Sequence, residues 1–330
     1  MAHFEGNRTM VMENYIVFSP WAYFVIAHVL SLGAAAMFAG LVYFLVTAKQ
    51  ISPRYRIANW LGAVVMVSAA LELGNQYFVW KQTFLPFVVN GETFFAAIGD
   101  SRFSNGYRYV NWSIDVPVLL TQIVVVLGLV GRKFWMPVIQ FTVAGLLMIY
   151  TGYIGQYYEA VVANGVTVAS LSQVTGGLVL GDISQGSLFW IMFVVSCVFY
   201  LWILYLVIAV GLNKDNLAKM TPAAQWWMKG VVWTLVGSWM LYLVGYLMPA
   251  VSISQESSVI RQISYTVADI VSKVIYGVMI GYVAQLRSNA EGYYEARLER
   301  IGFDNAGRPL HDFDPVPPEP LGGITDRSVT

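Results

Sequence analysis

The stretch RYVNWSIDVPVLLTQ, residues 108–122, is apolar enough to cross a membrane, yet it contains an arginine, an asparagine, an aspartate and a glutamine. On a helix that turns about 100° per residue, Asn111, Asp115 and Gln122 lie within roughly 40° of one another, with Arg108 close by. A charged group at the centre of a membrane costs roughly 2.5–3.5 kcal/mol, so such a stripe faces the interior of a bundle and often marks an ion or proton path. Polar contacts between packed helices are the simpler alternative.

The composition of the whole chain indicates a membrane protein. Of its 330 residues, 57% are hydrophobic and only 12% are charged, which is too apolar for an ordinary soluble domain. Several apolar runs can cross a hydrocarbon core of about 30 Å. They cover residues 21–48, 57–80, 107–131, 135–160, 187–212, 226–249 and 258–286. Because these runs are apolar on all sides, we expect an all-α protein with a seven-helix bundle, multi-pass in a lipid bilayer and without a nucleic-acid partner.

The loops predict the orientation of the bundle. Their basic residues gather on one side, at Lys49, Arg54, Arg56, Arg132, Lys133, Lys214, Lys219 and Lys229. Since loops rich in Lys and Arg stay in the cytoplasm, we expect the N-terminus outside and the C-terminus inside. Residues 1–20 lack a basic start followed by an apolar run, so we expect the first helix to direct insertion without a cleavable signal peptide. Cys197 is the single cysteine, which excludes an internal disulfide.

These patterns divide the chain into three parts. We expect residues 1–20 to form an extracellular segment, residues 21–288 the seven-helix domain, and residues 289–330 a cytoplasmic tail that is partly disordered. Within the domain, residues 162–186 link the fourth and fifth helices and are rich in Gly, Ser, Thr and Val. We expect this link outside the cell, where it could form a short hairpin.

The seventh run contains a lysine deep within an apolar segment. In YTVADIVSKVIYGVMIGYVA, residues 265–284, Asp269 precedes Lys273 by one helical turn, so both side chains point the same way. A buried lysine loses its charge readily, which is why such lysines often form Schiff bases. An ion pair with a purely structural role is the alternative.

Taken together, these residues resemble the microbial rhodopsins over roughly residues 20–288. The matching motifs are RYVNWSIDVP (108–117) and DIVSK (269–273), with aromatic residues at the pocket positions Trp112, Trp190, Trp239 and Tyr242. The resemblance implies that all-trans retinal is bound to Lys273 as a protonated Schiff base. It also implies a light-driven ion transporter and not an enzyme.

Three third-helix positions indicate the subfamily. Asn111, Asp115 and Gln122 resemble the Asn-Asp-Gln motif of the light-driven sodium-pumping rhodopsins, which export sodium and can move protons when sodium is scarce. Weaker matches lie at Asn59, Ser68, Glu159, Arg261 and Gly281. The resemblance implies that Ser68 and Asn111 form hydrogen bonds around Asp115. It also implies that Arg108 blocks the path on the extracellular side of the Schiff base. It further implies that Asn59, Gln122 and Gly281 shape cytoplasmic uptake, and that Glu159 and Arg261 form an extracellular exit cluster. For the last pair, a plain interfacial salt bridge is an equal alternative.

Physical chemistry suggests how this set could work. A positive charge on Lys273 needs an anion nearby, and Asp115 and Asp269 are the candidate counterions. Proton transfer to Asp115 would remove the charge that repels a cation. A sodium ion could then bind transiently near Asn111 and Asp269, since hard cations prefer oxygen ligands.

Glu72 adds a carboxylate to this region. It follows Ser68 by one turn, so it lies on the same helix face, about 5 Å toward the extracellular side. It could simply pair with Arg108, or it could share a proton with Asp115 or Asp269.

The chain also departs from the family pattern, and rival functions remain. Leu243 follows Tyr242 where proline is usual, and Gly62 stands where serine is common. The first alternative to sodium export is an outward proton pump, and the second is a photosensory rhodopsin. Members of the family commonly form ring-shaped homo-oligomers, often pentamers, and we expect a location in a bacterial plasma membrane.

Overall fold

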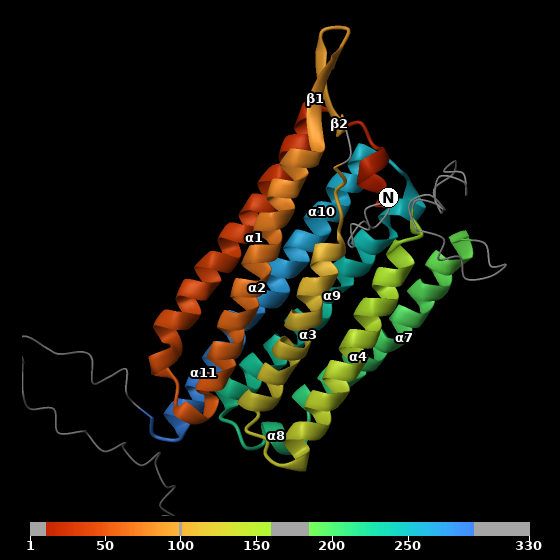
Figure 1. The fold of residues 1–330 in the computed structure, drawn as a ribbon. Coiled ribbons are helices and arrows are strands. Elements are labelled where there is room, and N and C mark those ends of the chain that lie inside the picture. Colours follow the sequence, from red (N-terminus) through yellow and green to blue (C-terminus); the bar gives the residue numbers. More distant parts are fainter. Residues whose placement is uncertain (1–10, 99–100, 160–184, 294–330) are drawn as a thin grey trace, which may run out of the picture.

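Seven helices long and apolar enough to cross a membrane lie side by side in the residues described by the computed structural model, which are 11–98, 101–159 and 185–293 (Figure 1). Their bounds are α1 Pro20–Thr47, α2 Pro53–Thr83, α3 Gly106–Val126, α4 Arg132–Gln156, α7 Gln185–Gly211, α9 Pro222–Val251, and a last span made of α10 Gln255–Asp269, η3 Ile270–Ile275 and α11 Tyr276–Ala290. The all-α, seven-helix prediction is confirmed. The expected hairpin between the fourth and fifth helices, and most of the expected tail, fall outside the described residues.

The helix ends follow local sequence signals. Pro20, Pro53 and Pro222 each stand at the start of a helix, where the missing N–H costs nothing. The third helix ends at Val126, five residues before the expected end, because Gly128 takes a positive φ of 66° that terminates the helix. Short helical pieces lie at both ends of the bundle: η1 Met12–Tyr15, η2 Ala48–Gln50 and α8 Lys214–Leu217.

A β-hairpin follows α2, where the sequence analysis expected none. Strands β1 Phe84–Val89 and β2 Glu92–Ala97 pair antiparallel and project beyond the helices (Figure 1). Asn90 and Gly91 form the turn with φ of 53° and 84°, the geometry for which Asn-Gly is the strongest short sequence signal. Phe95 also pairs with Phe18, which ties the hairpin to the chain before α1. This end of the molecule is called the hairpin end below.

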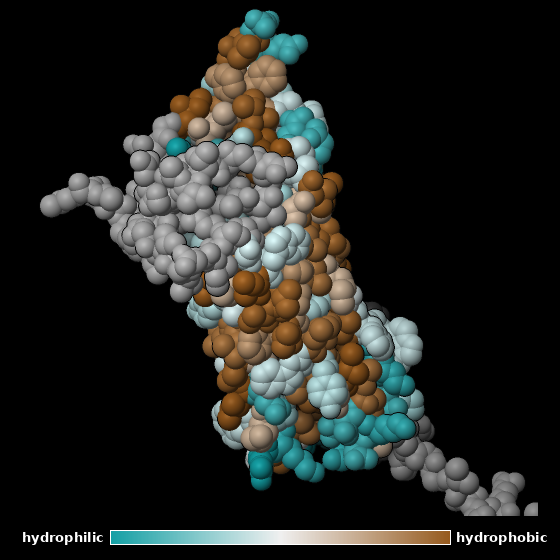
Figure 2. Space-filling view, turned by 90° about the vertical axis from the view of Figure 1, so that its right-hand side faces the viewer, coloured by the Kyte–Doolittle hydropathy of each residue, from teal (hydrophilic) through white to brown (hydrophobic). Residues whose placement is uncertain are grey.

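The opposite end contains α8 and the basic loops, and is called the arginine-rich end. Between the two ends, apolar side chains cover the surface, as the brown band in Figure 2 shows. Trp21, Phe24, Leu32 and Phe38 of α1 are among the large hydrophobic residues that are exposed there. Such a band matches the hydrocarbon region of a bilayer, and it leaves the polar residues of α3 and α10 in the interior.

Candidate functional site

Lys273 lies at the centre of the bundle and is 1% exposed. It belongs to η3, a six-residue π-helical segment that interrupts the last membrane span. Its Nζ lies 2.6 Å from Asp269 Oδ1 and 3.0 Å from Asp115 Oδ2, and it donates a hydrogen bond to Asn111 Oδ1 at 3.1 Å. The structure therefore brings the predicted lysine, both predicted counterions and the predicted amide together around one nitrogen.

Asp269 is held by donors from several helices. Besides Lys273, it accepts hydrogen bonds from Tyr242 Oη at 2.7 Å, Arg108 Nη1 at 2.9 Å and Trp112 Nε1 at 3.3 Å. A fully buried carboxylate is stable only with such partners. We therefore expect Asp269 to stay in place, while Asp115, with fewer donors, is the better acceptor for a proton.

An apolar cavity ends at Lys273. It comprises about 780 Å³ of space free of protein atoms, part of it open to the outside. Its walls come from α3, α4, α7, α9 and α10, and they include Trp112, Trp239, Tyr242 and Leu243. Apolar walls suit an apolar ligand, and Lys273 supplies an amine that can bond to a carbonyl carbon.

Trp190 does not line this cavity, which corrects the prediction that it is a pocket residue. Its side chain is 43% exposed, and it contacts the ring of Phe193. Phe193, Ser196, Cys197 and Tyr200 line the cavity from α7 instead. Trp190 lies about one turn before this set, and it is rotated roughly 70° around the helix from their mean direction.

Ser68 and Glu72 lie beside the central nitrogen on α2. Asn111 Nδ2 donates a hydrogen bond of 2.7 Å to Ser68 Oγ, which turns the Asn111 oxygen toward Lys273. Glu72 is 6% exposed, and neither of its carboxyl oxygens has a hydrogen-bond partner among the described residues. It lies within electrostatic reach of Lys273 and Asp115. Arg108 also lies within electrostatic reach of Glu72, but the alternative of a simple pair with it is not present as a hydrogen-bonded contact.

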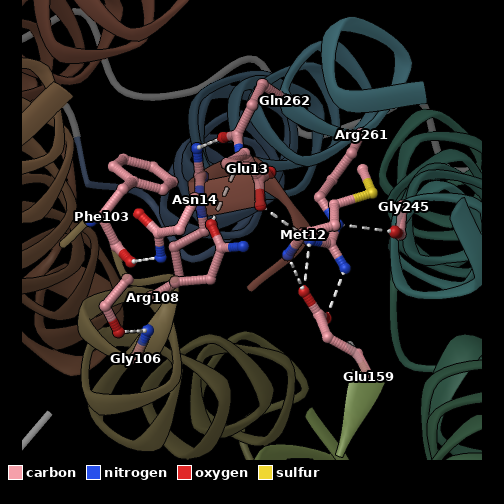
Figure 3. Close-up of polar contacts among 12 residues, drawn as sticks. Met12, Glu13, Asn14, Phe103, Gly106, Arg108, Glu159, Gly245, Arg261 and Gln262 are labelled. Atoms are coloured by element: carbon pink, nitrogen blue, oxygen red, sulfur yellow. Dashed lines mark hydrogen bonds and ion pairs between the residues drawn. The ribbon is translucent and has the colours of Figure 1, made fainter. Parts of the chain in front are cut away.

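Arg108, which is bonded to Asp269, begins a buried polar network that continues toward the hairpin end (Figure 3). Arg108 Nη2 donates to Gln262 Oε1 at 3.1 Å, and Gln262 Nε2 donates to Glu13 Oε1 at 2.8 Å. Glu13 Oε2 lies 3.0 Å from Arg261 Nη1, and Arg261 Nη2 lies 2.6 Å from Glu159 Oε2. The five side chains are all 0% exposed, so the Glu159–Arg261 pair is not a solvated surface salt bridge.

Glu13 and Gln262 are the members of this network that the sequence analysis missed, and Glu13 connects the two arginines. It lies in the short helix η1, and the backbone N–H of Met12 beside it donates to Glu159 Oε1 at 2.7 Å. A carboxylate between apolar residues in VMENYIVF is a sequence signal, but it does not reveal the contact with Arg261, which is 248 positions away. A buried charge is costly unless it has a partner. Because Glu13 pairs with the buried Arg261, this contact fixes the position of η1 against the helices.

Toward the arginine-rich end, the predicted uptake residues lie along one seam between helices. Gln122 Nε2 donates to Ala58 O at 2.7 Å, and Asn59 Nδ2 donates to Thr47 Oγ1 at 3.0 Å. The amide oxygens of Gln122 and Asn59 are buried without a partner among the described residues. Asn59 Oδ1 lies against Gly281, where a Cβ atom would be only 3.0 Å away. Any larger residue than glycine would therefore press on this amide.

A bundle of seven membrane helices, with a buried lysine between two carboxylates at the end of an aromatic-lined apolar cavity, defines the class of retinal-binding membrane proteins. The chain belongs to the bacteriorhodopsin-like protein family, whose sequence profile matches residues 24–286. Rhodopsins of this family bind retinal and are light-driven ion pumps, not enzymes.

Individual relatives and solved structures agree with this assignment. The chain is 22% identical to the green-light absorbing proteorhodopsin of Gamma-proteobacterium EBAC31A08 over 77% of this chain and 84% of that protein. The structure of xanthorhodopsin, described as a light-driven ion pump with dual chromophore, superposes with a TM-score of 0.68 at 24% identity, over 84% of this chain and 99% of the other. A thermophilic rhodopsin gives a TM-score of 0.67 at 26% identity, over 84% and 98% of the two chains.

Proposed function

We propose that this protein is a light-driven outward sodium pump that binds all-trans retinal at Lys273. The observation that carries the proposal is the amide of Asn111, whose oxygen lies 3.1 Å from the Lys273 nitrogen and whose Nδ2 is fixed by Ser68. A neutral oxygen at this position cannot take a proton but can bind a hard cation, together with the carboxylate of Asp269. The oxygens of Asn111 and Asp269 could therefore bind a cation once the Lys273 nitrogen has lost its positive charge.

The residues divide the work of transport between them. Retinal bound to Lys273 as a Schiff base would supply light absorption and the change that displaces the nitrogen-bound proton. Asp115, 3.0 Å from this nitrogen, is within reach to accept that proton. Once the nitrogen is neutral, a cation is no longer repelled from Asn111 and Asp269. Arg108, which is bonded to Asp269 and Gln262, lies between this cation position and the rest of the network that ends at Glu159.

The amide at Gln122 favours the proposal that the transported ion is not a proton. It lies on α3 toward the arginine-rich end, buried and hydrogen-bonded to Ala58 O. An amide does not release a proton near neutral pH, so this position cannot return a proton to Lys273. We propose that the arginine-rich end faces the cytoplasm of a bacterial cell, that Asn59, Gln122 and Gly281 shape uptake there, and that the protein forms ring-shaped oligomers.

The transported ion can be identified in illuminated cells. In sodium chloride we expect external alkalinisation, because protons enter passively to balance exported sodium, and a protonophore should enhance this signal. In potassium chloride the signal should vanish or reverse. An acidification in sodium chloride that a protonophore collapses would identify an outward proton pump instead.

Glu72 provides a separate prediction about the dark state. Two neighbouring buried carboxylates that share one proton keep a negative charge down to low pH, because the second proton binds only with difficulty. We expect Glu72→Gln to change the pH midpoint of the acid-induced red shift by about one unit or more, equivalent to roughly 1.4 kcal/mol. The absorption spectrum against pH measures this directly. An unchanged midpoint with normal transport would show that Glu72 does not share a proton with Asp115.

A further inference from the structure

The first turn of α2 and the residues just after α11 are joined at the arginine-rich end. Tyr55 Oη donates a hydrogen bond to Glu291 Oε1, and Arg54 Nη1 lies 3.3 Å from the same oxygen. Nearby, the backbone N–H of Ser52 donates to Ser288 Oγ at 2.9 Å. The Tyr55 side chain is 0% exposed although it lies close to the end of the helix. These contacts hold two helices together that are more than two hundred positions apart in the chain.

Further contacts reinforce the same junction. Arg56 Nη2 donates to Tyr293 Oη at 2.7 Å, and the guanidinium of Arg287 lies 4.9 Å from the centre of the Tyr55 ring. Arg287 Nη1 also donates to the carbonyl of Val126 at the end of α3 at 2.9 Å. Tyr55 is therefore packed against a cation and bonded to an anion, and its position depends on α11 and on the chain after it.

The junction lies next to the uptake residues, on the side toward the arginine-rich end. Asn59 follows Tyr55 by four residues and lies on the same face of α2. Its buried oxygen, which has no partner among the described residues, lies against Gly281 of α11. Ser288 follows Gly281 by seven residues, two turns along the same face. A cation that moves toward Asn59 between α2 and α11 therefore meets the Tyr55–Glu291 contact first.

We infer that Tyr55 and Glu291 form a clasp that closes the seam between α2 and α11 and must open before the transported cation reaches Asn59. Both are positioning residues, because they act on the ion path through the spacing of the two helices. The inference rests on the proposed transport, with this end of the bundle as the uptake side.

Tyr55→Phe and Glu291→Gln test the clasp in the full-length, retinal-bound protein. Phenylalanine keeps the buried ring and removes the hydroxyl donor, and glutamine keeps the size of the side chain and removes the charge. Each variant removes a hydrogen bond to a charged group, whose strength is reduced by solvent because the carboxylate of Glu291 is partly exposed. At sub-saturating sodium chloride we expect both variants to accelerate the sodium-dependent late step of the photocycle roughly three- to tenfold. The dark absorption band should stay unchanged.

Tyr282→Phe is the matched control, because Tyr282 also lies on α11 but is 39% exposed and contacts the ring of Trp227. Its photocycle should be that of the wild type at every salt concentration. Wild-type kinetics in both clasp variants would overturn the inference. If the rate of the late step in the wild-type protein does not depend on sodium concentration, the result contradicts sodium transport but does not contradict the clasp. In that case the clasp predicts faster proton uptake in both variants, measured with a pH-sensitive dye, and equal uptake rates would overturn it.

Discussion

Lys273→Ala protein should stay colourless when all-trans retinal is added, whereas the unchanged protein should develop a visible band. Lys273 is the buried lysine among the described residues, and it lies at the end of the apolar cavity. Without its amine, no covalent link to the carbonyl of retinal can form. The expected effect is a complete loss of the band, measured by absorption spectroscopy after reconstitution.

Two further variants separate chemistry from folding. Removal of Lys273 leaves Asp115 and Asp269 without their shared cation, which can destabilise a protein by about 3–5 kcal/mol. Lys273→Arg keeps a positive charge but not a nucleophilic amine, so it should fold, as circular dichroism would show, and remain colourless. Lys229→Ala, at an exposed lysine of α9, should colour normally. A wild-type visible band in Lys273→Ala would contradict the assignment.

Asp115→Asn should bind retinal but lose light-driven transport. The carboxylate lies 3.0 Å from the Lys273 nitrogen, and an amide at the same position cannot accept a proton. The nitrogen then stays charged, and a cation remains excluded from Asn111 and Asp269. We expect light-induced ion movement to fall to the background of cells without the protein.

Asp215→Asn is the control for this variant, because Asp215 lies exposed on α8. It should transport at the wild-type rate. Transport by Asp115→Asn at a comparable rate would show that another group, such as Asp269, accepts the proton.

Much of the bundle can be predicted because lipid imposes simple rules. The apolar runs identify the seven helices, and helical periodicity places Asn111, Asp115 and Gln122 on one face. The four-residue spacing between Asp269 and Lys273 likewise predicts their contact, which the structure shows at 2.6 Å. The π-helical geometry of this segment has no comparable sequence signal, because it depends on packing around the whole bundle.

The remaining features depend on distant contacts or on which face of a helix points to the interior. No local pattern shows that Glu13 meets Arg261, or that Tyr55 meets Glu291, because the partners come from opposite ends of the chain. Trp190 is close in sequence to the cavity-lining residues of α7, but it is 43% exposed. In a helix that is apolar on all sides, the sequence does not show which face points to the interior. The hairpin at 84–97 is different, since Asn90-Gly91 is a local sequence signal for a tight turn between two strands.

Direct measurement of sodium movement tests the central claim most closely. The full-length protein with retinal would be reconstituted into liposomes that contain radioactive sodium and a protonophore, so that proton gradients cannot drive a secondary flux. We predict light-dependent movement of sodium across the membrane that is absent from Asp115→Asn vesicles and unaffected by Asp215→Asn. Light-dependent proton movement in protonophore-free vesicles, with no sodium movement under either condition, would contradict it.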